Sequence, residues 1–280
     1  MTALNVKAMN CTGCGAALQL RAFEHSLTAV CPQCLAILDA KDPNLRVLQE
    51  FQGRERVTLQ IPLGSRGSWR GATYEVIGFQ QRTIEVDSVE YSWHEYLLFN
   101  PYHGFRYLTV YNGHWNDVRT VRALPRPVAY TPKHMVSVDG AVYTHFSRST
   151  AVTTYVLGEF PWAARRGDSV GVSDYIAPPL ILSSESTDEE TTWSRGEYTS
   201  AGEIWKAFKL PGAPPRPSGV FANQPSPHIQ PAREVWSIAW SFLLIAVAVV
   251  ALLFVSARNE NVFSQSYHFA GGQRETSLVT

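Results

Sequence analysis

Two C-x-x-C pairs near the N-terminus contain all four cysteines of the chain, and they constrain its fold more than any other feature. Cys11 and Cys14 form the first pair, and Cys31 and Cys34 form the second, with sixteen residues between the pairs. Four thiolates can hold a zinc ion in a tetrahedron, and this spacing is typical of a structural zinc site. Short apolar runs between the pairs have strand character, so we predict a zinc ribbon at residues 1–45.

Two other uses of these cysteines compete with structural zinc. A redox dithiol needs only one C-x-x-C pair beside a helix and would leave the second pair idle. A rubredoxin-like iron site uses the same two pairs, so ligand type alone does not separate iron from zinc. Because four thiolates leave no open position for water or substrate, we expect the metal to stabilise the fold or a docking surface and to take no part in catalysis.

The composition of the chain excludes several classes of protein. With 280 residues, of which 45% are hydrophobic, the chain can bury a core and is not a disordered protein. Lys plus Arg and Asp plus Glu both number 24, so the formal net charge is zero, and the ribbon carries no basic stripe. Nucleic-acid affinity depends on clustered Lys and Arg, so a nucleic-acid-binding zinc ribbon protein is the weakest alternative.

An uncharged apolar segment extends from Val235 to Ala257. As a helix it would reach about 34 Å, and the hydrocarbon core of a bilayer is about 30 Å thick. Trp236 and Trp240 lie near its start, where tryptophans favour a membrane interface. We therefore predict a single transmembrane helix at 233–257. Reduced cysteines suit the cytosol, and residues 1–9 contain no signal-like apolar run, so we expect a bacterial inner-membrane protein with a cytosolic N-terminus and an extracytoplasmic C-terminus.

A β-rich domain is predicted at 55–210, which makes the chain mainly β. The sequence from Gly71 to Val121 has the pattern of an antiparallel meander, with Asn112 and Gly113 as a hairpin turn. We expect this domain to form a small meander or a barrel-like sheet.

A second β-rich stretch follows the meander. It covers Ala141 to His145 and Val152 to Phe160, and the sequence after it indicates an irregular polar loop with an acidic run from Glu185 to Glu190. We interpret that run as a solvated loop, because its carboxylates lack the regular spacing and the turn glycine of a metal-binding loop.

One short helix is predicted near the end of the β-rich domain. Ser200 and Glu203 have the spacing of a capping box, and apolar residues follow them before Pro211. Residues 211–232 are rich in proline and predict an extended tether. Residues 258–280 are predicted to be a short extracytoplasmic tail, either vestigial or the start of a longer region.

Three motifs resemble catalytic signatures but lack their context. Residues 167–171 match G-x-S-x-G without a helix after the serine, so we expect a turn there. His94 and Glu95 begin like a zinc-protease motif, but Leu98 occupies the position of the second histidine. His103 and His114 could approach each other, although separate surface or core histidines are the commoner case. We therefore expect no catalytic residue.

Several aromatic motifs follow one another in order between Ile61 and Leu210. They are Gly71 to Gly78, Tyr91 to Leu98, Gly113 to Trp115, Gly158 to Trp162, Gly167-Asp168, Asp174-Tyr175 and Pro178-Pro179. In these motifs the chain resembles a family of bacterial domains of unknown function catalogued as number 4178. The resemblance implies that both β-rich stretches form one domain. It also implies an N-terminal zinc ribbon and a later transmembrane helix, and a genomic setting related to membrane stress and polyamines. Longer members continue after that helix, and the family implies no reaction.

Six residues of these motifs could either pack or bind a ligand: Trp93, Glu95, His114, Trp115, Glu159 and Trp162. In the packing interpretation, tryptophans fill the β core, and Glu95 or Glu159 binds backbone amides or an arginine. In the other interpretation, aromatic residues and carboxylates line a groove for a peptide or a ligand.

The function that these features favour is a non-enzymatic adaptor or sensor at the inner face of the membrane. It would present a cytosolic β domain to protein partners, for example in envelope stress. The alternative is an enzyme or an enzyme accessory with an aromatic and carboxylate pocket in the β domain, in a polyamine-related setting. A cluster of Glu95, His114 and Glu159 around one cavity would favour the alternative. The sequence identifies neither the partner nor a small-molecule ligand.

Overall fold

The chain folds into two compact units, at Met1–Pro225 and Ser226–Thr280. The computed structural model describes residues 6–50, 57–129, 134–226 and 232–257, and it describes no side chains at 232–239 and 256–257. The predicted tail at 258–280 lies outside these residues.

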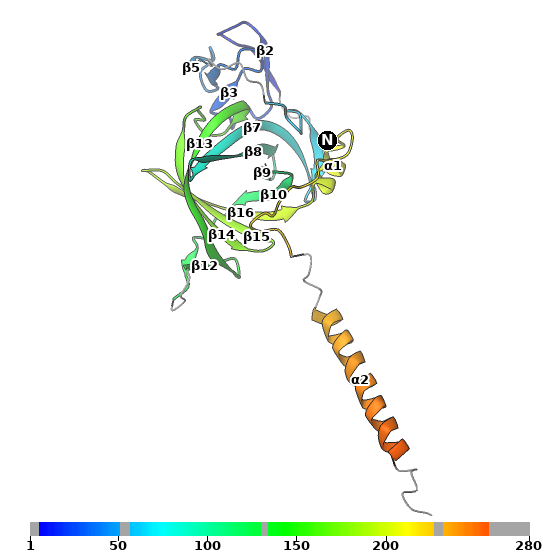
Figure 1. The fold of residues 1–280 in the computed structure, drawn as a ribbon. Coiled ribbons are helices and arrows are strands. Elements are labelled where there is room, and N and C mark those ends of the chain that lie inside the picture. The colour runs from blue at the N-terminus through cyan, green and yellow to red at the C-terminus, as the bar shows by residue number, and fades with distance from the viewer. Residues whose placement is uncertain (1–5, 51–56, 130–133, 227–231, 258–280) are drawn as a thin grey trace, which may run out of the picture. The chain divides into compact units, whose positions relative to one another are not determined.

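Eight antiparallel strands form a closed barrel in the first unit (Figure 1). In ring order they are β7 (Ala72–Val86), β8 (Val89–Asn100), β9 (Gly104–Tyr111), β10 (His114–Thr120), β16 (Thr191–Thr199), β15 (Leu180–Ser186), β14 (Ser169–Ala177) and β13 (Ala141–Phe160). Residues 153–158 of β13 pair with β7 and close the ring. The barrel therefore consists of two four-stranded meanders, β7–β10 and β13–β16, joined to each other along two seams.

The predicted meander is confirmed by β7 to β10. Asn112 and Gly113 form its last turn with positive φ angles of 47° and 82°, as a two-residue hairpin turn requires. The close approach of β7 to β13 depends on Gly78 and Gly158, since a Cβ on Gly158 would lie 2.2 Å from the Ile77 carbonyl oxygen. Side chains at this crossing would push the two strands apart.

One prediction for the second half of the barrel is confirmed and another is wrong. The segments Ala141 to His145 and Val152 to Phe160 are β structure as predicted, within one strand of 20 residues, β13, whereas the segment predicted to be irregular contains the strands β14, β15 and β16. The reason is that inward-facing positions of these strands carry polar side chains, including Asp174 and Glu185. Hydrophobic alternation, which identifies most strands, is therefore weak there.

Three short strands extend the sheet. β6 (Arg66–Trp69) pairs with β7, while β11 (Arg126–Pro127) and β12 (Met135–Val138) form a small hairpin beside the start of β13.

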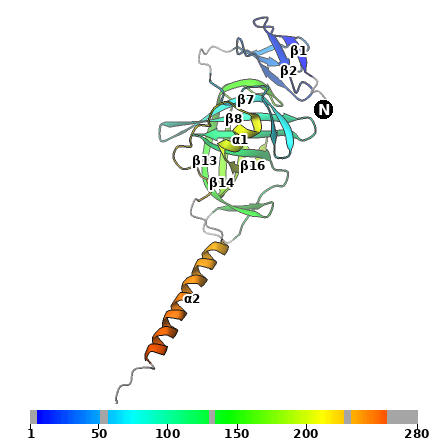
Figure 2. The ribbon, with the colours of Figure 1, turned by 90° about the vertical axis from the view of Figure 1, so that its right-hand side faces the viewer.

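The predicted helix is α1 (Ala201–Phe208), which lies against the barrel wall (Figure 2). Ser200 caps it, and Ser200 and Glu203 complete the reciprocal capping box that the sequence predicts. Ile204 and Phe208 are buried in a core with aromatic residues of the barrel, including Tyr96 and Trp115. The helix therefore covers one outer face of the barrel and ends at Lys209, which has a left-handed backbone conformation.

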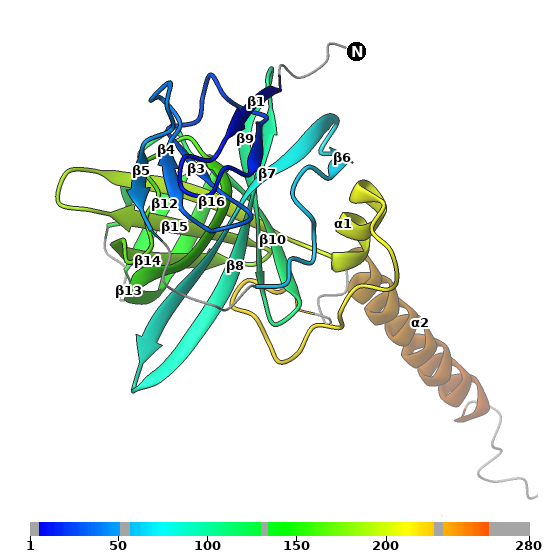
Figure 3. The ribbon, with the colours of Figure 1, turned by 90° about the horizontal axis from the view of Figure 1, so that it is seen from above.

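The N-terminal ribbon is continuous with the barrel sheet. Its first hairpin is β1 (Lys7–Asn10) and β2 (Ala17–Leu20). Its second sheet is β3 (Thr28–Val30), β4 (Ile37–Asp39) and β5 (Val47–Gln49), and β3 pairs with the end of β13, as the view from above shows (Figure 3). The ribbon thus extends to Gln49, four residues past the predicted boundary.

The second unit contains one helix, α2 (Ala232–Ala257). Its described side chains, at 240–255, are all exposed and uncharged. Of the residues that the structure describes, no helix combines the length and the apolar character that crossing a membrane needs. The predicted transmembrane helix at 233–257 includes residues whose side chains the structure does not describe. The prediction that this helix crosses a membrane is therefore not supported.

Candidate functional site

The four cysteines come together at one end of the ribbon. Their Sγ atoms all lie within 4.8 Å of one another, and Cys11–Cys34 and Cys14–Cys31 are each separated by 3.7 Å. A metal at about 2.3 Å from four tetrahedral sulfurs places those sulfurs about 3.8 Å apart. The cluster therefore has the dimensions of a four-thiolate metal site, as the spacing of the cysteines predicts. All four thiols are free of disulfides.

Two turns with the same hydrogen-bond pattern present these sulfurs. In the first, the amide of Gly15 donates to the carbonyl of Cys11 at 2.7 Å, and in the second the amide of Leu35 donates to Cys31 at 2.8 Å. Gly15 and Leu35 both have positive φ angles, of 76° and 61°. Leucine rarely adopts this conformation, so no sequence signal identifies the equivalence of the two turns. The buried side chain of Leu35 packs into the core that contains barrel residues.

The environments of the thiols differ. Burial raises the pKa of Cys31 and raises the pKa of Cys34 to about 12, whereas a hydrogen bond from the backbone amide of Ala16 lowers the pKa of Cys14. Four adjacent thiolates repel one another, so they form together only when a cation compensates their charge. The site is thus suited to a metal ion and unsuited to a free reactive thiolate.

Glu159 joins the ribbon to the barrel. This residue of β13 is only 3% exposed, and its carboxylate accepts hydrogen bonds from the amides of Arg21 and Ala22 at 2.6 and 2.9 Å and from the Ser26 hydroxyl at 3.0 Å. Burial raises the pKa of Glu159, and these hydrogen bonds oppose the shift. The contacts agree with the packing interpretation, in which Glu159 satisfies backbone amides.

Glu95 and His114 have neighbours that they do not share with Glu159. Glu95 accepts hydrogen bonds from Gln80 and from the Trp93 indole, both at 2.6 Å. His114 is 1% exposed, lies 2.9 Å from the Tyr198 hydroxyl and 3.2 Å from the Ser218 carbonyl oxygen, and stacks on Phe221. The structure therefore gives the three residues separate partner sets and does not group them around one cavity.

The remaining motif residues are explained by packing. Trp115 is fully buried and stacks on Tyr96, and Trp162 packs against Phe160 and Tyr107.

The other candidate residues also have separate positions. His94 packs edge-on against Phe79, and burial lowers the pKa of His94. His103 and His114 lie beyond opposite ends of β9, which separates them by about 25 Å along the strand. Ser169, the serine of the G-x-S-x-G match, begins strand β14.

An ion pair that the sequence did not indicate crosses the barrel interior. Arg82 on β7 contacts Glu185 on β15 at 2.7 Å, although β13 and β14 separate these strands in the ring. Arg82 is 4% exposed, and its Nε has no hydrogen-bond partner among the described residues. Burial raises the pKa of Glu185, and Glu95 and Asp174 add to the shift, although water reaches 41% of the Glu185 side chain. The prediction of a solvated loop is therefore wrong for Glu185, which lies on strand β15, and it holds for Asp188 to Glu190, which are exposed between β15 and β16.

Asp174 belongs to the same interior. Its carboxylate accepts hydrogen bonds from Ser183 at 2.6 Å and Ser147 at 3.3 Å, and burial raises its pKa. Among the described residues of this interior, the three carboxylates of Glu95, Asp174 and Glu185 thus outnumber the guanidinium of Arg82. Recognition of β14 and β15 as strands would have revealed these inward charges.

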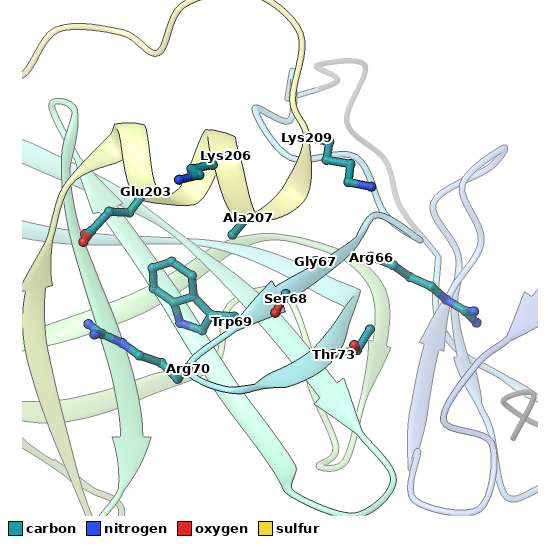
Figure 4. A pocket seen from close by; sticks show the side chains of 10 residues that line it. All are labelled: Arg66, Gly67, Ser68, Trp69, Arg70, Thr73, Glu203, Lys206, Ala207 and Lys209. Atoms are coloured by element: carbon teal, nitrogen blue, oxygen red, sulfur yellow. The ribbon is translucent and has the colours of Figure 1, made fainter. Parts of the chain in front are cut away.

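A surface cavity of about 710 Å³ lies between β6 and α1 (Figure 4). Its lining residues are Arg66, Gly67, Ser68, Trp69, Arg70, Thr73, Glu203, Lys206, Ala207 and Lys209. Four of them are basic and one is acidic. We call this cavity the β6 groove.

Comparison with known proteins identifies the barrel alone. The model of the family described as Domain of unknown function (DUF4178) matches residues 62–201, half of the chain, and this range contains β6 to β16. The match confirms the family that the aromatic motifs indicated, and it leaves the ribbon and α2 outside. No curated protein and no solved structure matches the chain.

Proposed function

Because the chain belongs to the DUF4178 family, for which no activity is described, we propose its function from the geometry: it is a non-enzymatic, membrane-anchored adaptor or sensor. A structural zinc ion holds the ribbon, and the ribbon and barrel together form a surface for protein partners. The observation that carries this proposal is the four-thiolate cluster in a ribbon fused to the barrel sheet. In such a site the metal has no open position for chemistry.

Zinc is the metal that the donor set favours. The sulfur separations fit a tetrahedral ion at about 2.3 Å, and four thiolates satisfy its coordination. Iron in the same ligands would make the protein coloured and redox-active, so metal analysis of the purified chain distinguishes the two.

The separate partners of Glu95, His114 and Glu159 support a role without catalysis. Each of the three side chains already makes hydrogen bonds that hold the fold together. An acid–base pair for catalysis needs its groups within reach of one substrate.

Exposed apolar side chains on α2 support the membrane anchor. Trp240, Phe242 and Phe254 are 58%, 70% and 73% exposed, in a stretch without charge. A contiguous apolar surface of this kind is stable when lipid or protein covers it. We place α2 in the bacterial inner membrane and the ribbon and barrel at its cytosolic face.

Affinity capture from detergent-solubilised bacterial membranes tests the proposal. The full chain is compared with a Cys11→Ser/Cys14→Ser variant and with Thr12→Ser, a control in the same turn that keeps the hydroxyl bonded to the Leu45 carbonyl. We expect about one zinc per chain and a set of captured proteins in the parent and in the control, and loss of both in the double variant. Capture that is unchanged without zinc, or recovery of the chain outside the membrane fraction, would contradict the proposal.

A second candidate is a ligand-binding accessory, favoured by the charged barrel interior. Three carboxylates face one arginine there, which is an arrangement that an organic cation could complete. The setting that the family resemblance implies suggests spermidine as the probe. A thermal shift with spermidine that Glu185→Gln removes would favour this function, and equal shifts in both proteins would exclude it.

A further inference from the structure

Strand β6 is a free edge of the sheet. It is the last strand in the sheet order, and in the described part of the chain no other strand pairs with its outer side. Its hairpin turn at Arg70 and Gly71 has positive φ angles of 49° and 84° and joins Trp69 directly to Ala72. In a two-residue hairpin this closing pair is hydrogen-bonded, and the pairs alternate from there.

This register determines which backbone groups of β6 are free. Trp69 and Gly67 bond inward to β7, and the Ser65 carbonyl continues the pattern by accepting from Val76 at 2.9 Å. The N–H and C=O groups of Ser68 and Arg66 therefore point away from β7. They form a template for one more strand.

The β6 groove follows this edge. Its lining includes Arg66 and Ser68 from one face of the strand and Gly67 and Trp69 from the other, so the cavity runs around the side of β6 (Figure 4). On the Gly67 face the helix is in close contact, since a Cβ on Gly67 would lie 2.8 Å from the Ala207 carbonyl oxygen. Space for an added chain is thus limited to the edge.

The charge of the groove selects the occupant. Arg66 and Arg70 are neutralised in part by Glu75 at 2.7 Å and Asp117 at 3.0 Å. Lys206 and Lys209, on the α1 side of the groove, form no ion pair within the described residues. A segment with carboxylates would therefore gain favourable contacts that a neutral or basic segment would not.

We infer that β6 binds an extended acidic segment of a partner protein as an added strand. Backbone groups of Ser68 and Arg66 supply the strand pairing, and Lys206 and Lys209 select the acidic side chains. This inference rests on the adaptor function proposed above and names the chemistry of its partner.

Binding of two synthetic peptides to the full chain in detergent tests this inference. The probes are acetyl-EVDVEVD-amide and its charge-reversed partner acetyl-KVKVKVK-amide, measured by fluorescence anisotropy. We expect the acidic peptide to bind at least about tenfold more tightly, and Lys206→Glu/Lys209→Glu to remove the difference.

A proline substitution separates strand addition from simple charge attraction. Ser68→Pro deletes only the outward N–H and keeps the pairing with β7, since proline is tolerated at an edge. We expect Ser68→Pro to weaken the acidic peptide about tenfold and Ser68→Ala to bind like the parent. Melting curves of all variants verify that they fold.

Three outcomes would overturn the inference. They are equal binding of both peptides, unchanged binding by Ser68→Pro, and binding of phosphatidylglycerol vesicles through the two lysines without peptide binding. None of these results changes zinc-dependent capture, so the failure of this inference is distinguishable from failure of the adaptor function.

Discussion

The ribbon and the barrel are both built from antiparallel strands, yet they are stabilised in different ways. Ribbon strands have three or four residues, and the ribbon core contains nine buried residues, two of them metal-site cysteines. The strands of the barrel ring have 7 to 20 residues and leave no open edge between β7 and β13. A unit as small as the ribbon usually needs a metal to fold, whereas a closed sheet with an aromatic core does not.

The boundary between these regions is a shared structure. Strand β13 pairs with β14 and β7 in the barrel and with β3 in the ribbon. Glu159, on the same strand, accepts hydrogen bonds from two backbone amides of the ribbon. Ribbon residues such as Leu35 and Ile37 also pack into cores with barrel side chains, so damage to the ribbon should loosen the end of β13 and these contacts while the barrel strands stay paired. The four predictions below test this division.

Metal removal should have the largest effect, and it should be confined to the ribbon. Structural zinc supplies on the order of 10 kcal/mol to domains of this kind, so Cys34→Ser or a chelator should unfold β2 to β4. Hydrogen exchange followed by mass spectrometry should show lost protection there and retained protection in β8 and β9. If the barrel strands lost protection equally, the proposed independence of the barrel would be wrong.

Asp117→Asn should destabilise the barrel and leave the ribbon folded. Asp117 is 3% exposed, and its carboxylate accepts hydrogen bonds from Arg106 at 2.7 Å and from Arg70 at 3.0 Å. Loss of its charge should therefore lower the free energy of unfolding, measured in urea, by about 3–5 kcal/mol.

The acid dependence of stability provides a second measurement on Asp117. Burial alone would raise the pKa of Asp117, but the hydrogen bonds and charge of Arg106, with a hydrogen bond from Arg70, lower it overall. A lowered folded-state pKa gives stability that is present above the unfolded value of about 4 and is lost as the pH falls through the folded value. The difference between parent and variant should therefore shrink in acid, and a constant difference would contradict the assignment.

Glu159→Gln should lower the stability of the junction between ribbon and barrel by about 2 kcal/mol. The reason is that the amide nitrogen of Gln would face one of the groups that now donate a hydrogen bond to the Glu159 carboxylate. Since burial raises the pKa of Glu159, the part of the stability that comes from protonation of its carboxyl is complete below the unfolded value of about 4 and is lost as the pH rises through the folded value. Limited proteolysis between ribbon and barrel should therefore increase with pH in the parent and lose that dependence in the variant. If proteolysis of the two proteins depended on pH in the same way, a group other than Glu159 would be responsible for that dependence.

Arg46→Ala should have the smallest effect, below about 0.5 kcal/mol, because the pair with Asp39 is exposed. Arg46 is 68% exposed, and its contact with Asp39 is 3.3 Å long. Chelator titration of the variant should match the parent. A large loss would mean that ribbon stability is more distributed than the metal-centred account allows.

The features that could be predicted correctly from the sequence were those that depend on local patterns of residues. The cysteine spacing, the Asn112-Gly113 turn and the capping box of Ser200 each involve residues close in the chain, so their geometry follows from their own chemistry. The aromatic motifs placed the barrel in its family. Of their tryptophans, Trp115 and Trp162 proved to be packing residues, while the Trp93 indole donates a hydrogen bond to Glu95.

Positions that depend on distant segments were missed. The polar strands β14 to β16 lack hydrophobic alternation because one face of each strand points into a charged interior. Arg82 and Glu185 are 103 residues apart, and only the closed ring brings them together. The role of Leu35 was also hidden, because its left-handed backbone is stabilised by contacts that no local pattern records.

By itself, the sequence determined that four cysteines form one cluster of metal-site dimensions, that a β meander follows, and that one capped helix ends the domain, since each of these depends mainly on local sequence. Only the tertiary structure decided that the sheet closes, that Glu159 holds the ribbon to the barrel, and that β6 has an edge, beside basic side chains, with which no described strand pairs. Closure and edges are properties of strand pairing across the whole chain, and the energy of pairing depends on which partners the fold makes available.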